Sequence, residues 1–226
     1  MLSAVKEIGK LIIQREGSGL LEILVEDANA NGNYKKVLTI LMEQDQGKIK
    51  FVRVELEDYD SQKKFKYLYR SGAANGADLT PTAKLGPDPE GTFDRKILGW
   101  FSILDDKKSN FSPENKAFLS NLRKELEDNS KVIKSDILRL RAAVPKKENL
   151  FITLKIKLDN QYKYVGDFDV FKETLISQVN KKDQQCAAED KVCSICGERK
   201  PIVFGNLDTY AFYTLDKPGY ITGGFE

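Results

Sequence analysis

The stretch Lys48-Ile49-Lys50-Phe51-Val52-Arg53-Val54-Glu55-Leu56 alternates polar and apolar side chains, with one slip at Phe51-Val52. Alternation with a period of two is the pattern of a β-strand that buries one of its faces. Residues 35–42 also have the composition of a strand, and Gln44-Asp45-Gln46-Gly47 between the two segments favours a tight turn. The sequence therefore predicts an antiparallel β-hairpin.

A second hairpin is expected further along the chain. Phe151-Ile152-Thr153-Leu154-Lys155-Ile156-Lys157-Leu158 is a strand-like run, and Asp159-Asn160 can turn the chain back through residues 162–165.

Apolar residues recur at helical spacing in the other segments. We expect a helix capped by Thr92, one that starts at Ser112-Pro113-Glu114, one at residues 131–143 and one capped by Asp167. A short helix is also expected at residues 2–14. The apolar stripes of these helices indicate core packing rather than cofactor sites.

Antiparallel hairpins packed with several helices define an α+β fold. Residues 181–190 read as a charged linker, so we predict a domain boundary near residue 182. The amino-terminal α+β domain would span residues 1–182, and a cysteine-containing, zinc-knuckle-like segment, truncated at its end, would span residues 183–226.

The cysteines lie at Cys186, Cys193 and Cys196, and Gly197 follows the last of them. Two thiolates in a C-x-x-C turn can hold one metal ion, so we expect a structural zinc ion bound by Cys193 and Cys196, with Cys186 as a less secure third ligand. The chain has no histidine, so the fourth ligand would be a carboxylate, a water or a residue after Glu226. Inert thiols and a redox C-x-x-C pair remain alternatives.

Charge is clustered although the net charge is only +2 and 31% of the residues are charged. Lys63, Lys64, Lys66 and Arg70 fall within eight residues, and six basic residues with one acid lie at residues 131–147. Such patches can meet phosphate, although a solvated surface of mixed charge is the alternative interpretation.

A long loop rich in glycine and proline follows Arg70 and runs to residue 91. Its glycines would let backbone amides approach an anion, with Arg70 and Lys84 as neighbouring cations. The alternative is a surface excursion without a function. Lys217, which precedes Pro218-Gly219 and a glycine pair at 223–224, is the third candidate nucleic-acid contact.

The lack of histidine argues against several enzyme classes. Ser-His-Asp triads and H-E-x-x-H metal sites need imidazole, and no G-x-x-x-x-G-K-[ST] phosphate loop is present. We therefore expect no catalytic activity. No apolar run reaches 18 residues, which predicts no membrane span, and the charged start of the chain lacks a signal-peptide pattern, so the cytoplasm is the expected location.

Several stretches together resemble the large subunit of the subtype I-B CRISPR effector complex, in particular its amino-terminal portion. They are Met1-Leu2-Ser3-Ala4-Val5-Lys6-Glu7-Ile8-Gly9, Lys66-Tyr67-Leu68-Tyr69-Arg70-Ser71-Gly72, Leu79-Thr80-Pro81-Thr82-Ala83-Lys84, Cys193-Ser194-Ile195-Cys196-Gly197 and Phe212-Tyr213-Thr214-Leu215-Asp216-Lys217-Pro218-Gly219 with Gly223-Gly224-Phe225. Members of that family are longer, so the resemblance implies a fragment or a split subunit.

The resemblance implies a non-catalytic subunit of an RNA-guided DNA surveillance complex. Its expected partners are the guide RNA at its 5′ handle, target double-stranded DNA, and the handle-capping and backbone subunits. Its expected task is to recognise the short motif (PAM) that flanks the DNA target, while the guide reads the rest. A zinc-binding scaffold that contacts only protein, or a metal-dependent nuclease, are the alternatives.

Overall fold

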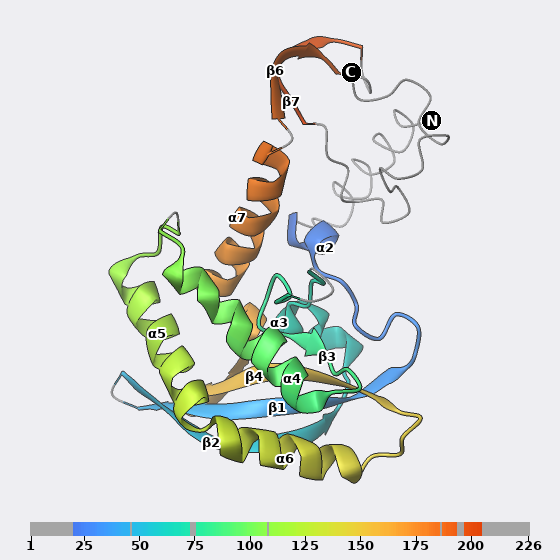
Figure 1. Cartoon of the computed structure of the whole chain (residues 1–226), viewed down its shortest axis with the longest axis vertical. Coiled ribbons are helices and arrows are strands. Elements are labelled where there is room, and N and C mark those ends of the chain that lie inside the picture. Colours follow the sequence, from blue (N-terminus) through green and yellow to red (C-terminus); the bar gives the residue numbers. More distant parts are fainter. Residues whose placement is uncertain are drawn as a thin grey trace. The chain divides into compact units, whose positions relative to one another are not determined.

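The computed structural model describes residues 20–45, 47–72, 76–107, 109–185, 187–193 and 197–204. The chain forms two compact units, one of Gly19–Leu175 and one of Met1–Ser18 with Ile176–Glu226. The helix predicted at residues 2–14 lies outside the described residues. The α+β class is confirmed by the larger unit, in which helices pack on a mixed sheet (Figure 1).

The sheet of the larger unit has the strand order β2-β1-β4-β3, and β5 also pairs with β4. Both predicted hairpins are confirmed, because β1 pairs antiparallel with β2 and β4 pairs antiparallel with β5. The strands are β1 (Tyr34–Asp45), β2 (Lys48–Asp58), β3 (Ala83–Lys84), β4 (Asn149–Leu158) and β5 (Gln161–Tyr164).

The slip in the alternation of β2 marks a β-bulge. Leu41 lies opposite Arg53, whereas Met42 lies opposite Phe51, so Val52 has no partner on β1. An extra residue in one strand shifts the following side chains to the other face. The irregular pair Phe51-Val52 in the sequence is therefore the signature of this bulge.

The parallel pairing of β1 with β4 is not part of the hairpin prediction. Val37 pairs with Phe151, Thr39 with Thr153 and Leu41 with Lys155. Central strands that are covered on both faces lose the polar alternation that reveals an edge strand. The residues of β1 from Val37 to Met42 are accordingly all buried, including Thr39.

The helix predicted to begin at Thr92 is present, but its helix type and its first residue differ from the prediction. Its first turn is α4 (Pro89–Thr92), which Asp88 caps by accepting a hydrogen bond from Gly91 N at 2.9 Å. The predicted cap at Thr92 is therefore wrong. A wide π-helical segment (Phe93–Leu98) and a 3-10 segment (Gly99–Asp105) continue the element.

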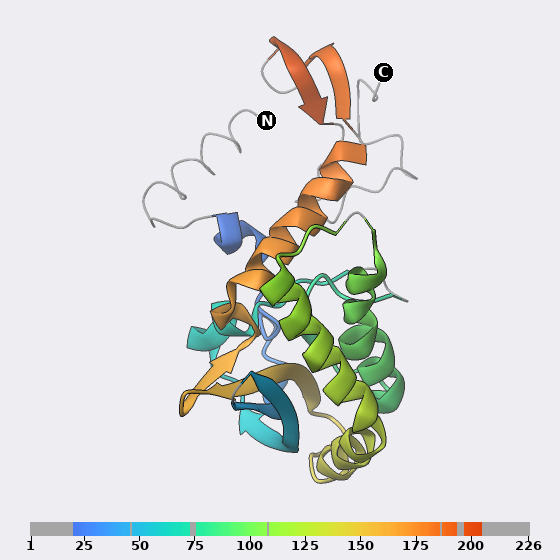
Figure 2. The ribbon, with the colours of Figure 1, turned by 90° about the vertical axis from the view of Figure 1, so that its left-hand side faces the viewer.

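Two longer helices cover one face of the sheet (Figure 2). They are α5 (Pro113–Asp128) and α6 (Ser130–Ala142). Ser112 caps α5 as predicted, because its Oγ accepts a hydrogen bond from Asn115 N at 3.2 Å. Residues at helical spacing on α5 and α6 form the core with the sheet: Leu119, Leu122, Leu126, Ile133 and Ile137 are all buried.

Short elements lie before, between and after the strands. They are α2 (Leu20–Leu24), a 3-10 turn at Ser61–Lys63, α3 (Lys64–Tyr67) and a 3-10 turn at Val165–Asp167. The last helix, α7 (Asp169–Gln185), begins after the predicted cap Asp167, whose carboxylate instead accepts a hydrogen bond from Tyr164 N at 2.9 Å.

The second unit contains a β-hairpin of β6 (Ala187–Val192) and β7 (Arg199–Phe204). The linker predicted at residues 181–190 is therefore wrong, because α7 extends to Gln185 and β6 begins at Ala187. A paired contact between Arg199 and Asp190, with both N···O distances at 2.6 Å, joins the two strands.

Candidate nucleic-acid interface

The segment between α3 and α4 is anchored in the core of the larger unit. Thr80 and Thr82 are fully buried, and their hydroxyl groups donate to Leu68 O at 2.7 Å and to Tyr67 O at 2.9 Å. Thr82 Oγ1 also lies 2.9 Å from Thr153 Oγ1 on β4. The segment is therefore held in the core at Thr80 and Thr82, and its contact with nucleic acid stays a prediction.

Backbone contacts hold both ends of the same segment. Leu79 N donates to Arg70 O at 3.1 Å, and Leu85 N donates to Leu150 O at 2.8 Å. Gly72 is packed so closely that a Cβ atom there would lie 2.5 Å from Ala77 O. The sequence suggested glycines that approach an anion, but this glycine is needed because the protein's own backbone passes next to it.

An aromatic cluster lies beneath the segment, against β1 and β4. Rings contact one another edge to face, with 5.5 Å between the centroids of Tyr69 and Phe151 and 5.4 Å between those of Tyr67 and Tyr164. Such edge-to-face pairs add to the stability gained by burial. The cluster comprises Tyr34, Tyr59, Tyr67, Tyr69, Phe151 and Tyr164.

Lys84 lies at one end of this cluster. Its Nζ is 5.0 Å from the ring centroid of Tyr34 and 5.4 Å from that of Tyr69. Among the described residues, no carboxylate lies within ion-pair distance of Lys84, so the two rings are its main neighbours. Burial raises the pKa of Tyr69, which keeps that ring a neutral phenol. The result is a half-buried cation in a defined position.

Arg70 is positioned differently. Its side chain is 20% exposed, and Nη1 lies 3.3 Å from Glu26 Oε1. Ser71 Oγ donates to the same carboxylate at 2.9 Å. A guanidinium carries five N–H donors, so the contact with Glu26 leaves donors for another acceptor. Arg70 and Lys84 thus belong to one anchored segment, but only Arg70 has a carboxylate partner.

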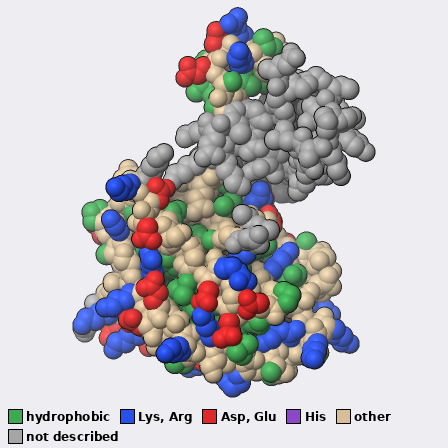
Figure 3. Space-filling model, viewed as in Figure 1, with side chains coloured by type: hydrophobic (Ala, Val, Ile, Leu, Met, Phe, Trp, Pro, Cys, Tyr) green, Lys and Arg blue, Asp and Glu red, His purple; other side chains and the backbone are tan. Residues whose placement is uncertain are grey.

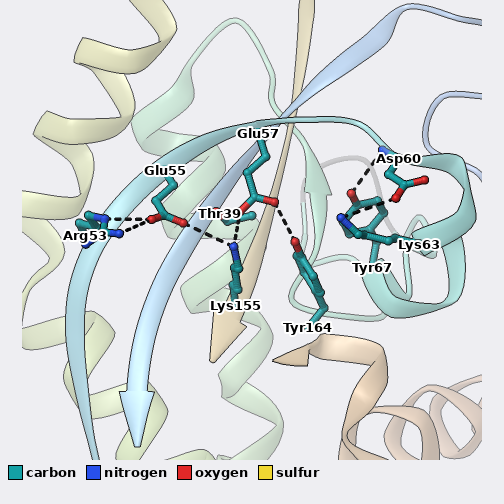
Figure 4. A network of polar contacts seen from close by, with 9 residues as sticks. All are labelled: Thr39, Arg53, Glu55, Glu57, Asp60, Lys63, Tyr67, Lys155 and Tyr164. Atoms are coloured by element: carbon teal, nitrogen blue, oxygen red, sulfur yellow. Dashed lines mark hydrogen bonds and ion pairs between the residues drawn. The ribbon is translucent and has the colours of Figure 1, made fainter. Parts of the chain in front are cut away.

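A polar network surrounds Glu57 at the opposite end of the aromatic cluster (Figure 4). The carboxylate accepts hydrogen bonds from Lys155 Nζ at 2.5 Å, Tyr164 OH at 2.7 Å and Thr39 Oγ1 at 3.1 Å. Burial opposes ionisation of Glu57, but these donors outweigh it and hold its pKa below the usual value. The network therefore keeps a charged carboxylate in place within the sheet.

Two of the six basic residues at 131–147 pair with acidic side chains. Lys134 pairs with Asp94 at 2.7 Å, and Arg139 pairs with Asp136 at 2.9 Å. Arg141 donates to carbonyl oxygens at the end of α6, including Val144 O at 3.2 Å. Basic and acidic side chains intermingle over the helical face (Figure 3), so this face lacks a large patch of one sign.

The cysteine turn is described only in part. Cys193 forms no disulfide, and its backbone amide donates to Glu198 O at 2.9 Å. Gly197 has a φ of 71°, and its amide donates to Cys193 O at 2.8 Å. These two contacts link the residues that follow β6 to those that precede β7. Cys186, Cys196 and Lys217 lie outside the described residues, so the zinc site and the third nucleic-acid contact stay predictions.

The aromatic neighbours of Lys84 and the network around Glu57 were missed from the sequence. Tyr34 and Tyr69 lie far apart in the chain and meet only through the fold. The acidic run at residues 55–60 was visible, but its partner Lys155 is supplied by another strand. The only hint of the aromatic cluster in the sequence was the group of tyrosines near Lys66, and this group alone does not predict that their rings pack together.

An α+β unit with an anchored, cation-bearing segment is suited to binding a charged partner. A family model described as "CRISPR-associated protein TM1802 (cas_TM1802) N-terminal domain" matches residues 1–177. The model of the central domain of the same protein matches residues 190–226. The chain therefore belongs to the TM1802 family of CRISPR-associated proteins, which indicates a role in CRISPR defence.

The other comparisons give no match. Neither the curated proteins nor the solved structures contain a match to this chain. Within the described part of the chain, no helix is both long enough and apolar enough to cross a membrane.

Proposed function

We propose that the chain is a non-catalytic subunit of a CRISPR RNA-guided DNA surveillance complex, namely the amino-terminal portion of a subtype I-B large subunit. It would recognise the motif that flanks the DNA target and contact the 5′ handle of the guide RNA. Handle-capping and backbone subunits would be its protein partners. The observation that carries the proposal is the match to two successive domains of one CRISPR-associated family.

The geometry of Lys84 supports a contact with DNA. A contact that positions or reads DNA needs a side chain held in a fixed place by its neighbours. Strand β3 and the rings of Tyr34 and Tyr69 provide this support for Lys84. Because guide pairing supplies most of the sequence specificity, a small number of such side chains is sufficient for the flanking motif.

Arg70 would act as a second cation of the same interface. Its contact with Glu26 fixes the guanidinium but also offsets part of its charge. We therefore expect Arg70 to contribute less than Lys84 to the attraction of phosphate.

A structural zinc ion held by Cys193, Cys196 and Cys186 is also proposed. The described part of the turn fits this, because the Gly197 φ of 71° and the two backbone hydrogen bonds close the chain next to Cys193. A metal at this turn would hold β6 and β7 together.

The experiment is a DNA-binding titration of the assembled complex at two salt concentrations, with matched and mismatched flanking motifs. Lys84→Ala should weaken binding. Loss of a phosphate contact would affect all sequences alike and lower the salt slope by about one, whereas loss of a base contact would cost about 1–3 kcal/mol with the matched motif only.

Three further variants make the result specific. Lys116→Ala removes an exposed lysine of α5 and should leave binding unchanged. Glu26→Gln frees Arg70 from its carboxylate and should maintain or strengthen binding, while Arg70→Ala should weaken it. If Lys84→Ala and Arg70→Ala both bind like the wild type under all conditions, this segment is not a nucleic-acid contact.

A further inference from the structure

A second surface with basic and aromatic side chains lies where α3 meets β5, on the side of the sheet opposite α5 and α6 (Figure 2). We define the α3–β5 surface by Lys63, Lys64, Phe65 and Lys66 of the α3 region and Tyr162 of β5. Lys163 points to the other face of β5, where its Nζ lies 6.0 Å from the ring centroid of Phe168. The sequence already showed a cluster of Lys63, Lys64 and Lys66, and these lysines do not belong to the proposed interface around Lys84.

Close packing joins the two parts of this surface. Lys63 Nζ lies 5.7 Å from the ring centroid of Tyr164 on β5. A Cβ atom on Gly166, just after β5, would collide with the carbonyl oxygen of Phe65. The backbone of α3 therefore rests directly on the end of β5, and residues separated by about 100 positions form one continuous surface.

Two aromatic rings of this surface face solvent. Phe65 is 39% exposed and Tyr162 is 51% exposed, although both are large enough to favour the core. Each ring has an ammonium group close by, since Lys64 Nζ lies 5.1 Å from the Phe65 centroid and Lys155 Nζ lies 4.6 Å from the Tyr162 centroid. The rings of the aromatic cluster beneath Lys84 are, by contrast, largely packed against one another.

Some of the lysines around these rings are paired with carboxylates and others are not. Lys63 pairs with Asp60 at 3.6 Å, and Lys155 pairs with Glu57. Within the described part of the chain, Lys64 and Lys66 have no carboxylate at ion-pair distance. This differs from the basic run of α6, in which Lys134 pairs with an acidic side chain.

We propose that the α3–β5 surface binds single-stranded nucleic acid, with bases stacked on Phe65 and Tyr162 and phosphates near Lys64 and Lys66. Exposed rings alternating with cations are the arrangement that single strands require, because each base offers a flat face and each linkage a negative charge. A duplex hides the faces of its bases, so it would gain only from the lysines. The proposal rests on the proposed function in taking nucleic acid as the ligand, but it concerns a different site.

The test measures fluorescence anisotropy of the full chain with a labelled thymidine strand about 16 nucleotides long, and with the corresponding duplex. Tyr162→Leu and Phe65→Leu keep apolar bulk but remove the ring. Each should weaken single-strand binding about 10-fold and leave duplex binding nearly unchanged. Circular dichroism and the urea midpoint of each variant show whether it is folded.

A charge-matched pair of variants tests the lysines. Lys64→Gln with Lys66→Gln should lower the salt slope of single-strand binding by about 1.4, that is about 0.7 for each cation. Lys146→Gln with Lys147→Gln removes the same charge from an exposed turn elsewhere in the larger unit and should leave the slope unchanged. Equal effects of the two pairs would show general charge attraction and would overturn the proposal.

Photocrosslinking gives an independent readout. A strand that contains 5-iodouracil should crosslink to Phe65 or Tyr162, and mass spectrometry identifies the modified peptide. Crosslinks confined to other segments would contradict the proposal even if Lys84 proves to contact duplex DNA. Conversely, crosslinks at these rings together with wild-type motif recognition by Lys84→Ala would support this site and contradict the proposed function of Lys84.

Discussion

The anchoring of the segment that carries Lys84 can be tested with the substitution Thr82→Val. Thr82 is fully buried and donates its single hydroxyl hydrogen to Tyr67 O at 2.9 Å. The hydrogen between Thr82 Oγ1 and Thr153 Oγ1, which are 2.9 Å apart, must therefore come from Thr153. Valine has nearly the same shape but can neither donate nor accept.

The magnitude follows from two lost hydrogen bonds. Tyr67 O and the Thr153 hydroxyl each lose a partner in a buried environment, and an unsatisfied buried group costs about 1–3 kcal/mol. We expect Thr82→Val to lower the free energy of unfolding of the larger unit by about 2–6 kcal/mol. Thr174→Val is the matched control, because buried Thr174 only donates to Val170 O within α7 and its loss should cost about 1 kcal/mol.

Urea unfolding followed by tryptophan fluorescence is a suitable assay. Trp100 is the only tryptophan of the chain, is 2% exposed, and donates from Nε1 to Leu79 O in the segment itself at 3.1 Å. The double variant Thr82→Val with Thr153→Val should be less destabilised than the sum of the single variants, because no hydroxyl is left without a partner. A change below about 0.5 kcal/mol for Thr82→Val would refute the anchoring argument.

Two further predictions concern Glu57 and Cys193. Glu57→Gln should destabilise the larger unit by about 2 kcal/mol at neutral pH. The pKa of Glu57 in the folded state is lowered, so the stabilisation by its carboxylate is present above the unfolded pKa of 4.5 and is lost as the pH falls. In urea unfolding, the difference in free energy of unfolding between wild type and variant should therefore narrow below pH 4.5. A difference that does not change with pH would contradict this. Metal analysis of the reduced, unchelated chain should find zinc in nearly equimolar amount and none in Cys193→Ser, and a metal-free wild type would end the zinc proposal.

Local patterns predicted much of the larger unit. Both hairpins, the cap at Ser112 and the buried stripes of α5 and α6 depend on neighbouring residues, which a sequence displays directly. Even the bulge at Val52 was visible as a slip in the alternation. The parallel pairing of β1 and β4 was not, because it depends on residues more than 100 positions apart and both strands are buried on their two faces.

The candidate site was predicted in composition but not in geometry. From the sequence, Arg70 and Lys84 were predicted to flank a glycine-rich loop whose backbone amides could bind an anion. The sequence could not show that buried threonines anchor this loop or that Glu26 pairs with Arg70, since these contacts join distant segments. It also could not separate the basic residues that have acidic partners from those of the α3–β5 surface.

Binding of flanked DNA targets by the complex reconstituted with and without this chain tests the central claim most directly. With a fixed guide and a matched target, affinity is measured for duplexes that differ only in the flanking motif. The wild-type chain should confer a preference for one set of motifs, and this preference should disappear when the chain is omitted. A preference of equal size without the chain, or equal affinity for all motifs with it, would show that the chain does not recognise the flanking motif.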